Sequence, residues 1–87
     1  MFSTEIADIV LKAIAQIAPE ANLTDLPANA RFRDQFDFDS VDFVNLIERL
    51  ELALQVKIPE MDYPQFISLN GCIAYLEKLP RTKTDNE

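Results

Sequence analysis

The sequence predicts an all-α fold, namely a small bundle of three longer helices and one short helix. Apolar residues recur at helical spacing in three separate segments, and no segment alternates like a strand. The chain has five prolines and only one glycine, a composition typical of helices separated by prolines rather than of a turn-rich sheet protein. Its 87 residues suffice for one core, so we expect one helical domain over residues 1–80 and a polar tail over 81–87.

The first two helices are defined by apolar stripes and by the residues at their ends. The first covers about residues 4–17 and stops because Pro19 disfavours helical geometry at the residue before it. The second covers about residues 40–54, with Asp39 as its N-cap, and must end before Ile58-Pro59. Its predicted apolar stripe consists of Val44, Ile47, Leu50 and Leu54.

The C-terminal part predicts one brief helical turn and one longer helix. The turn covers about residues 62–66, where Pro64 is acceptable only within a first turn. Ser68 is a suitable N-cap for the last helix, which ends at Pro80. Cys72 falls on the apolar face of this helix and is expected to be a core thiol. Gly71, in the first turn, costs helix stability and has no functional explanation from the sequence.

The segment over residues 19–39 shows no sustained period. A loop of this length is unusual in a compact domain, so it should either pack through apolar anchors or carry function. The expected anchors are Phe32, Phe36 and Phe38, and the residues expected in solvent are Arg31 and Arg33.

Charge and residue types exclude several classes of function. The net charge is −7, so nucleic acid would be repelled and a partner should be basic. The chain has no histidine and one cysteine, which rules out an internal disulfide and a Cys/His zinc site. No stretch approaches the length of a membrane span, and we expect a soluble, cytoplasmic protein that does not insert into a membrane.

The stretch FDFDSVDF, residues 36–43, places one serine among three acids at the start of the second helix. Ser40 would be the first helical residue, where unsatisfied backbone N–H groups and the helix dipole favour an anion or a phosphate ester. Asp39 and Asp42 would repel such a group, so a basic partner is expected to dock there. The plainer interpretation is an exposed serine beside a capping box that has no further role.

Catalysis and metal binding fit this stretch poorly. A serine nucleophile needs an adjacent base, and no convincing one is present. Asp37, Asp39 and Glu48 occupy positions 1, 3 and 12 of an EF-hand loop. However, Val41 at position 5 brings no side-chain oxygen, and Asp42 stands at position 6, where the sharp turn needs Gly. We therefore expect no metal site and no enzymatic activity.

The run DQFDFDSVDFVNLIERLELALQVKIP, residues 34–59, resembles the acyl carrier proteins. The signature of that family is an Asp-Ser-Leu-Asp-like tetrad that opens the second helix, followed by an apolar stripe and an Ile-Pro ending. The tetrad here is Asp39-Ser40-Val41-Asp42. The similarity extends over most of the chain, because the first helix, the long loop, the short helix and the last helix follow in the family's order.

The resemblance implies a carrier rather than an enzyme. A 4′-phosphopantetheine arm from coenzyme A would be esterified to Ser40 by a magnesium-dependent phosphopantetheinyl transferase, with Asp39 as the flanking residue of the motif. Acyl groups would then be held as thioesters on the thiol of the arm. A monomeric carrier would present them to acyl-transferring or acyl-activating enzymes with basic docking patches, in fatty-acid, lipid or specialised acyl biosynthesis.

In members of this family the second helix is the main docking surface. The docking residues implied here are Asp37, Val41, Asp42, Phe43, Asn45, Glu48 and Lys57. Asp37 stands where the family usually has Gly. The helix is also less acidic than in typical fatty-acid carriers, because Asn45, Leu52 and Lys57 dilute its charge. Weaker charge steering and more apolar contact favour a specialised carrier over the housekeeping one.

Two other functions stay open. An aminoacyl or peptidyl carrier would use the same arm, although Asp37, Phe38 and Asp42 fit its usual Gly-Gly-His/Asp-Ser-Leu signature poorly. A small helical adaptor would bind partners through the second helix without any modification. The substitution Ser40→Ala should abolish the function of a carrier and barely affect the docking of an adaptor.

Overall fold

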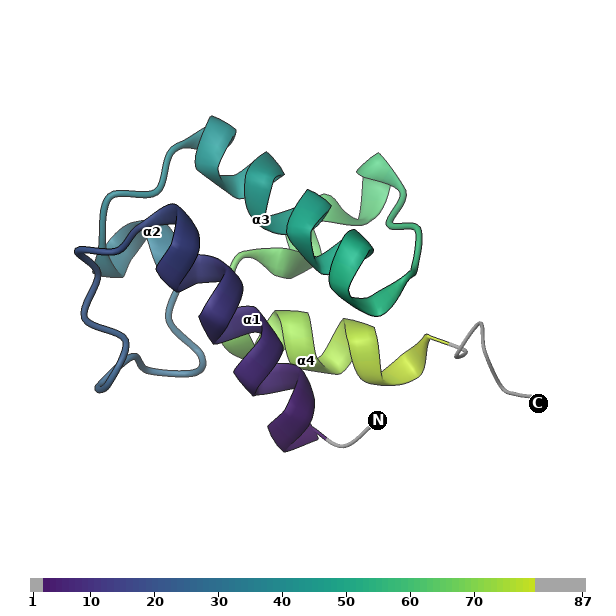
Figure 1. The fold of residues 1–87 in the computed structure, drawn as a ribbon, viewed down its shortest axis with the longest axis horizontal. Coiled ribbons are helices and arrows are strands. Elements are labelled where there is room, and N and C mark those ends of the chain that lie inside the picture. Colours follow the sequence, from purple (N-terminus) through teal and green to yellow (C-terminus); the bar gives the residue numbers. More distant parts are fainter. Residues whose placement is uncertain (1–2, 80–87) are drawn as a thin grey trace.

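The structure, a computed structural model, describes residues 3–79 and is entirely helical apart from its connections (Figure 1). Its elements are α1 (Ser3–Ile17), α2 (Phe32–Gln35), α3 (Ser40–Leu54), the 3₁₀ helix η1 (Glu60–Phe66) and α4 (Leu69–Lys78). The described residues contain no strand, only an isolated antiparallel bridge between Arg31 and Ser68. The predicted all-α fold is confirmed, while the predicted tail over 81–87 lies outside the described residues.

The bundle is organised around α1, which packs against both α3 and α4, while η1 lies against α4. Apolar faces of these elements meet in one core. Its fully buried members include Ile6, Val10, Ile14, Phe32, Leu46, Ile47, Leu50, Phe66 and Cys72. No helix within residues 3–79 has both the length and the apolar character needed to cross a membrane.

Three local features differ from the sequence-based expectations. The one-turn helix α2 was not predicted, because four residues are too few to show a helical period. The short helix η1 begins at Glu60, two residues before the predicted start, directly after Pro59 as its N-cap. Val44 was expected in the apolar stripe of α3, but it is 38% exposed, whereas its neighbour Phe43 packs against the core.

The long segment between α1 and α3 is held in place by aromatic rings and by backbone hydrogen bonds. Phe32 is buried, and its ring lies 6.1 Å from that of Phe36 and 5.7 Å from that of Phe38. The Phe32 N–H donates to the Ile67 carbonyl at 2.8 Å, and the Asn70 N–H donates to the Ala28 carbonyl at 2.8 Å. The prediction that the three phenylalanines anchor this segment is confirmed, and the anchoring fixes the residues that lead into α3.

Gly71 lies where the start of α4 packs against the end of η1. A Cβ at this position would stand 2.1 Å from the carbonyl oxygen of Gln65, and real Cβ atoms do not approach that closely. The Gly71 N–H donates to Ser68 Oγ at 3.1 Å, which confirms Ser68 as the N-cap of α4. Close approach of two backbone segments therefore requires glycine here, a reason that the sequence alone does not reveal.

Two titratable groups help to join η1 and α4. Cys72 is buried, as predicted, and its Sγ lies 3.7 Å from the Phe66 carbonyl oxygen. Burial raises the pKa of the Cys72 thiol to about 12, so the thiol stays protonated at neutral pH. The Tyr75 hydroxyl donates to Asp62 Oδ2 at 2.6 Å, and this hydrogen bond raises the pKa of Tyr75 to about 12.

Candidate functional site

The N-terminus of α3 is closed by a reciprocal capping box. Asp39 Oδ1 accepts the Asp42 N–H at 2.8 Å, and Asp42 Oδ2 accepts the Asp39 N–H at 3.3 Å. Both carboxylates also lie at the positive end of the helix dipole, where negative charge is stabilising. The predicted N-cap role of Asp39 is confirmed, and the start of α3 is thereby fixed at Ser40.

Ser40 is the first residue of α3, and its side chain is exposed. The capping box uses the N–H groups of Asp39 and Asp42. Within residues 3–79, the N–H groups of Ser40 and Val41 donate no hydrogen bond to a protein acceptor. The Ser40 hydroxyl is thus open to a second protein and lies beside two free backbone donors, an arrangement suited to a phosphate ester.

A hollow of about 470 Å³ begins at Ser40 and runs toward the corner between η1 and α4. Its lining is largely apolar and consists of Phe32, Arg33, Phe38, Asp39, Ser40, Phe43 and Ile67. The Phe43 ring is held edge-on against Tyr63 at 6.2 Å, and the Phe38 ring is held against Phe36 at 5.5 Å. These ring contacts hold the two phenylalanines that form two walls of the hollow.

The two arginines before α3 are both exposed, as predicted, but their surroundings differ. Arg31 Nε donates to Asp34 Oδ2 at 3.0 Å and forms an ion pair across one turn. Arg33 lines the hollow and has no hydrogen-bond or ion-pair partner among the described residues. One cation is therefore already paired with a carboxylate, and the other is available beside Ser40.

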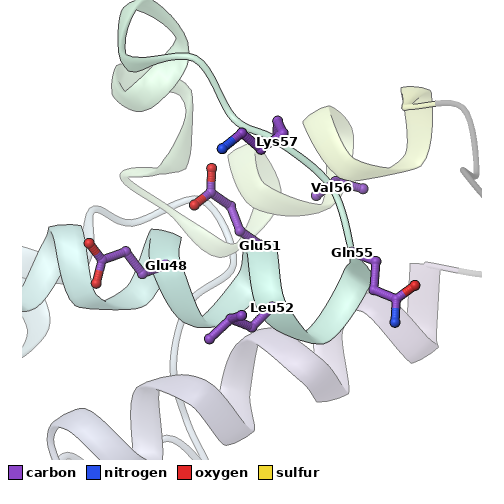
Figure 2. A pocket seen from close by; sticks show the side chains of 6 residues that line it. All are labelled: Glu48, Glu51, Leu52, Gln55, Val56 and Lys57. Carbon is purple, nitrogen blue, oxygen red and sulfur yellow. The ribbon is translucent and has the colours of Figure 1, made fainter.

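The opposite end of α3 carries a second hollow, of about 500 Å³, shown in Figure 2. Leu52 is 80% exposed there, and the hollow also borders Glu48, Glu51 and Lys57. Glu51 Oε2 accepts the Ile58 N–H at 2.8 Å, so this carboxylate holds the chain that follows α3. Glu48 has no such partner within the described part of the chain, which leaves its carboxylate available to another molecule.

The predicted docking residues fall into two groups along α3. The first group lies within three residues of Ser40 in the sequence and consists of Asp37, Val41, Asp42 and Phe43. Glu48 and Lys57 border the second hollow, and Asn45 is exposed between the groups. Val41 is 66% exposed, whereas Asp42 and Phe43 are half-buried and engaged in contacts of the fold. Their docking role stays a prediction. Sequence reasoning did not assign a site role to Arg33, Ile67 or Leu52, which have no motif that could have marked them.

Metal binding gains no support from the geometry. Across residues 3–79, no cluster of three or more His, Cys, Asp or Glu side chains could hold a metal ion. An EF-hand would need a loop over residues 37–48, but residues 40–48 lie in α3.

Comparison with known proteins assigns the family. Residues 6–76 match the family model described as the phosphopantetheine attachment site. The chain is 28% identical over 79 residues to an acyl carrier protein of Campylobacter hominis, which covers 91% of this chain and 94% of that protein. It is 32% identical over 74 residues to an acyl carrier protein of Brachyspira hyodysenteriae, which covers 85% of this chain and 90% of that protein. The chain belongs to the acyl carrier protein family.

Membership of this family implies a covalently attached 4′-phosphopantetheine group. Acyl carrier proteins are in general carriers rather than catalysts, and they work with phosphopantetheinyl transferases and acyl-handling enzymes. The residues at the start of α3 fit the group. An accessible hydroxyl can form the phosphate ester, free N–H groups and an unpaired arginine suit the phosphate, and an apolar hollow adjoins them. When bound, the group supplies a thiol that can form thioesters.

Proposed function

We propose that this carrier holds acyl intermediates as thioesters on a 4′-phosphopantetheine arm attached to Ser40. The carrier would present them to partner enzymes of fatty-acid, lipid or specialised acyl biosynthesis. The observation that supports this most strongly is the position of the Ser40 hydroxyl, exposed on the first residue of α3 beside a fixed capping box. We further propose that residues 1–80 form the carrier domain and act as a cytoplasmic monomer.

The proposed attachment is a phosphoryl-group transfer in which the carrier supplies only the acceptor. The Ser40 Oγ–P bond forms while the P–O bond within the pyrophosphate of coenzyme A breaks. The adenosine bisphosphate part leaves, and the hydroxyl proton passes to a base of the transferase. The carrier has no histidine, and its residues offer the exposed hydroxyl without an evident base of their own. An exposed acceptor hydroxyl without a base of its own supports a carrier that is modified by another enzyme.

The exposed face of α3 supports docking with modest charge steering and substantial apolar contact. Val41 and Leu52 are mostly exposed apolar residues on α3, and Arg49 offsets the charge of Glu48 there. Arg49 Nη1 donates to Gln16 Oε1 at 2.5 Å, which ties its side chain to α1. Exposed apolar side chains gain more from a matching apolar surface than from water. We therefore propose partners with an apolar docking surface, and a specialised rather than a housekeeping pathway.

The attachment is tested by fragment-ion mass spectrometry after treatment with coenzyme A, magnesium and a broad-specificity transferase. We expect the added group on the peptide that contains Ser40 and on no other serine. Ser68 is the internal comparison, because its hydroxyl is half-buried and accepts the Gly71 N–H. A group found elsewhere in the chain would contradict the assignment of Ser40.

The choice of pathway is tested by transfer from the loaded carrier to the chain-elongation enzymes of fatty-acid synthesis. A specialised carrier should be accepted at least about tenfold less efficiently than a standard fatty-acid carrier, a difference of about 1.4 kcal/mol in transition-state binding. Equal efficiency for the two carriers would contradict the specialised pathway while leaving the carrier function intact.

A helical adaptor is the second candidate, because exposed apolar side chains on α3 would also suit an unmodified docking protein. The two functions are separated by Ser40→Ala, which removes the acceptor hydroxyl from an exposed position and leaves the capping box in place. Binding of a partner that is unchanged in the variant, together with an unmodified wild type, would favour the adaptor.

A further inference from the structure

The hollow beside Ser40 contains one cationic side chain, that of Arg33. The rest of its lining is apolar except for Asp39 and Ser40. Arg33 belongs to α2, which is anchored by the buried Phe32, so the start of its side chain is held in place. The fold thus brings an arginine from one element and the proposed attachment serine from another to a common surface.

A phosphodiester on Ser40 would meet an electrostatic conflict at this surface. Asp37, Asp39 and Asp42 all lie within three residues of Ser40, and the chain as a whole carries a net charge of −7. The capping hydrogen bonds and the helix dipole compensate Asp39 and Asp42 in part, but a further anion on the same turn adds repulsion. A nearby cation would offset that repulsion, and guanidinium binds phosphate oxygens with well-matched hydrogen bonds.

Arg31 cannot take this role as readily as Arg33. Its guanidinium is already bonded to Asp34 at 3.0 Å, and it does not line the hollow. Arg33 lines the hollow and has no partner in the part of the chain that the structure describes. The two arginines can therefore be compared directly, because the Arg31 guanidinium has a carboxylate partner within the described residues and the Arg33 guanidinium has none.

We propose that Arg33 binds the phosphate of the 4′-phosphopantetheine arm and directs the first part of the arm over the apolar hollow formed by Phe38, Phe43 and Ile67. This inference rests on the proposed attachment at Ser40. Arg33 acts as a positioning residue, because it orients the arm and does not touch the thiol end of it. The dimethyl group that follows the phosphate in the arm is the apolar part that this hollow would cover.

The test is nuclear magnetic resonance on the modified full-length protein, with intact mass to establish modification. In the wild type we expect nuclear Overhauser contacts from the dimethyl group to Phe38, Phe43 and Ile67, and from the arm to the Arg33 side chain. The phosphorus resonance should move in Arg33→Gln, move less in Arg33→Lys, which keeps the charge, and stay in place in Arg31→Gln. Amide spectra of the unmodified variants check that each is folded.

The outcomes separate this inference from the proposed function. The wild type could gain the group and yet show no contact from the arm to Arg33 or to the hollow formed by Phe38, Phe43 and Ile67. That result overturns the role of Arg33 and leaves the attachment at Ser40 standing. Equal phosphorus resonances in wild type, Arg33→Gln and Arg31→Gln overturn it as well. A wild type that gains no mass overturns the attachment, and with it the role of Arg33. The wild-type contacts decide the question even where the transferase does not modify Arg33→Gln.

Discussion

The two ends of α3 lie on the same helix but have different chemistry. At the N-terminal end a capping box, an exposed hydroxyl and an aromatic hollow with one free arginine gather around Ser40. At the C-terminal end the hollow is bordered by the exposed Leu52 and by charges of both signs (Figure 2). Glu51 at this end accepts the Ile58 N–H and so holds the chain that follows α3. Of the two ends, the N-terminal end therefore has the groups that suit a phosphate ester, while the C-terminal end suits contact with the surface of another protein.

The sharpest test of this contrast is thiol reactivity, because an arm on Ser40 would add a solvent-exposed thiol to a chain whose own thiol is buried. Burial raises the pKa of Cys72 to about 12, whereas a free thiol has a pKa of about 8.5. In a disulfide-exchange assay at about pH 8, the modified protein should therefore react quickly with about one equivalent of the disulfide reagent. The unmodified protein should react roughly a thousandfold more slowly, since the thiolate fraction falls with the raised pKa.

Denaturant provides the control for this assay, because unfolding should make Cys72 react at the rate of an ordinary thiol. Fast reaction of the folded, unmodified protein would show that Cys72 is accessible and would contradict its place in the core.

The segment between η1 and α4 contributes Ile67 to the hollow beside Ser40. In this region the backbone at Gly71 packs closely against the Gln65 carbonyl. Gly71→Ala should favour the helix by up to about 1 kcal/mol through propensity but clash with the Gln65 carbonyl. Overpacking of this kind costs about 1–3 kcal/mol, and a contact with backbone lies at the upper end, so we expect a net loss of about 2 kcal/mol. Urea unfolding measures it, with Ala74→Gly at an exposed site of α4 as the control for propensity. An unchanged or higher stability of Gly71→Ala would contradict the close packing.

The contrast in docking is tested by placing the same charge at each end of α3. Val41 adjoins Ser40, so Val41→Glu should lower kcat/KM of the transferase about tenfold, because an apolar contact is replaced by a desolvated charge. Leu52→Glu, at the other end of α3, should change kcat/KM of the transferase by less than about twofold. Circular dichroism melting checks that both variants stay folded. Equal losses at the two ends would show that the transferase covers the whole helix and would remove the functional distinction between them.

The smallest effects are expected from the hydrogen bonds that fix each end. Asp39→Ala removes the N-terminal cap, and Glu51→Ala removes the bond to the Ile58 N–H. Each should lower the free energy of unfolding by about 1 kcal/mol. Only Asp39→Ala should also slow modification, since it loosens the turn that carries Ser40. If Glu51→Ala slowed modification as much, the two ends would be coupled and the contrast would fail.

Much of the fold could be predicted from the sequence, because capping residues and prolines mark the ends of the helices. Asp39 and Ser68 cap their helices as expected, and the bounds of α3 agree with the prediction. The one-turn helix α2 could not be predicted, since it depends on the burial of Phe32 rather than on a period. The outward direction of Val44 was missed for a related reason: the aromatic ring of Phe43 takes the inward position beside Tyr63.

The site could be predicted only in part. Ser40 and its acids are neighbours in the sequence, so a motif can mark them. The hollow is different, because it joins residues from α2, from the start of α3 and from the segment before α4. The free state of Arg33 and the need for glycine at position 71 are likewise consequences of packing between segments that are distant in the sequence.

The most direct test of the central claim is the intact mass of the purified protein after incubation with coenzyme A, magnesium and a phosphopantetheinyl transferase, beside Ser40→Ala. We predict that the wild type gains the mass of one phosphopantetheine group and that the variant gains none. No gain with several transferases, or an equal gain in the variant, would contradict the attachment of the arm to Ser40.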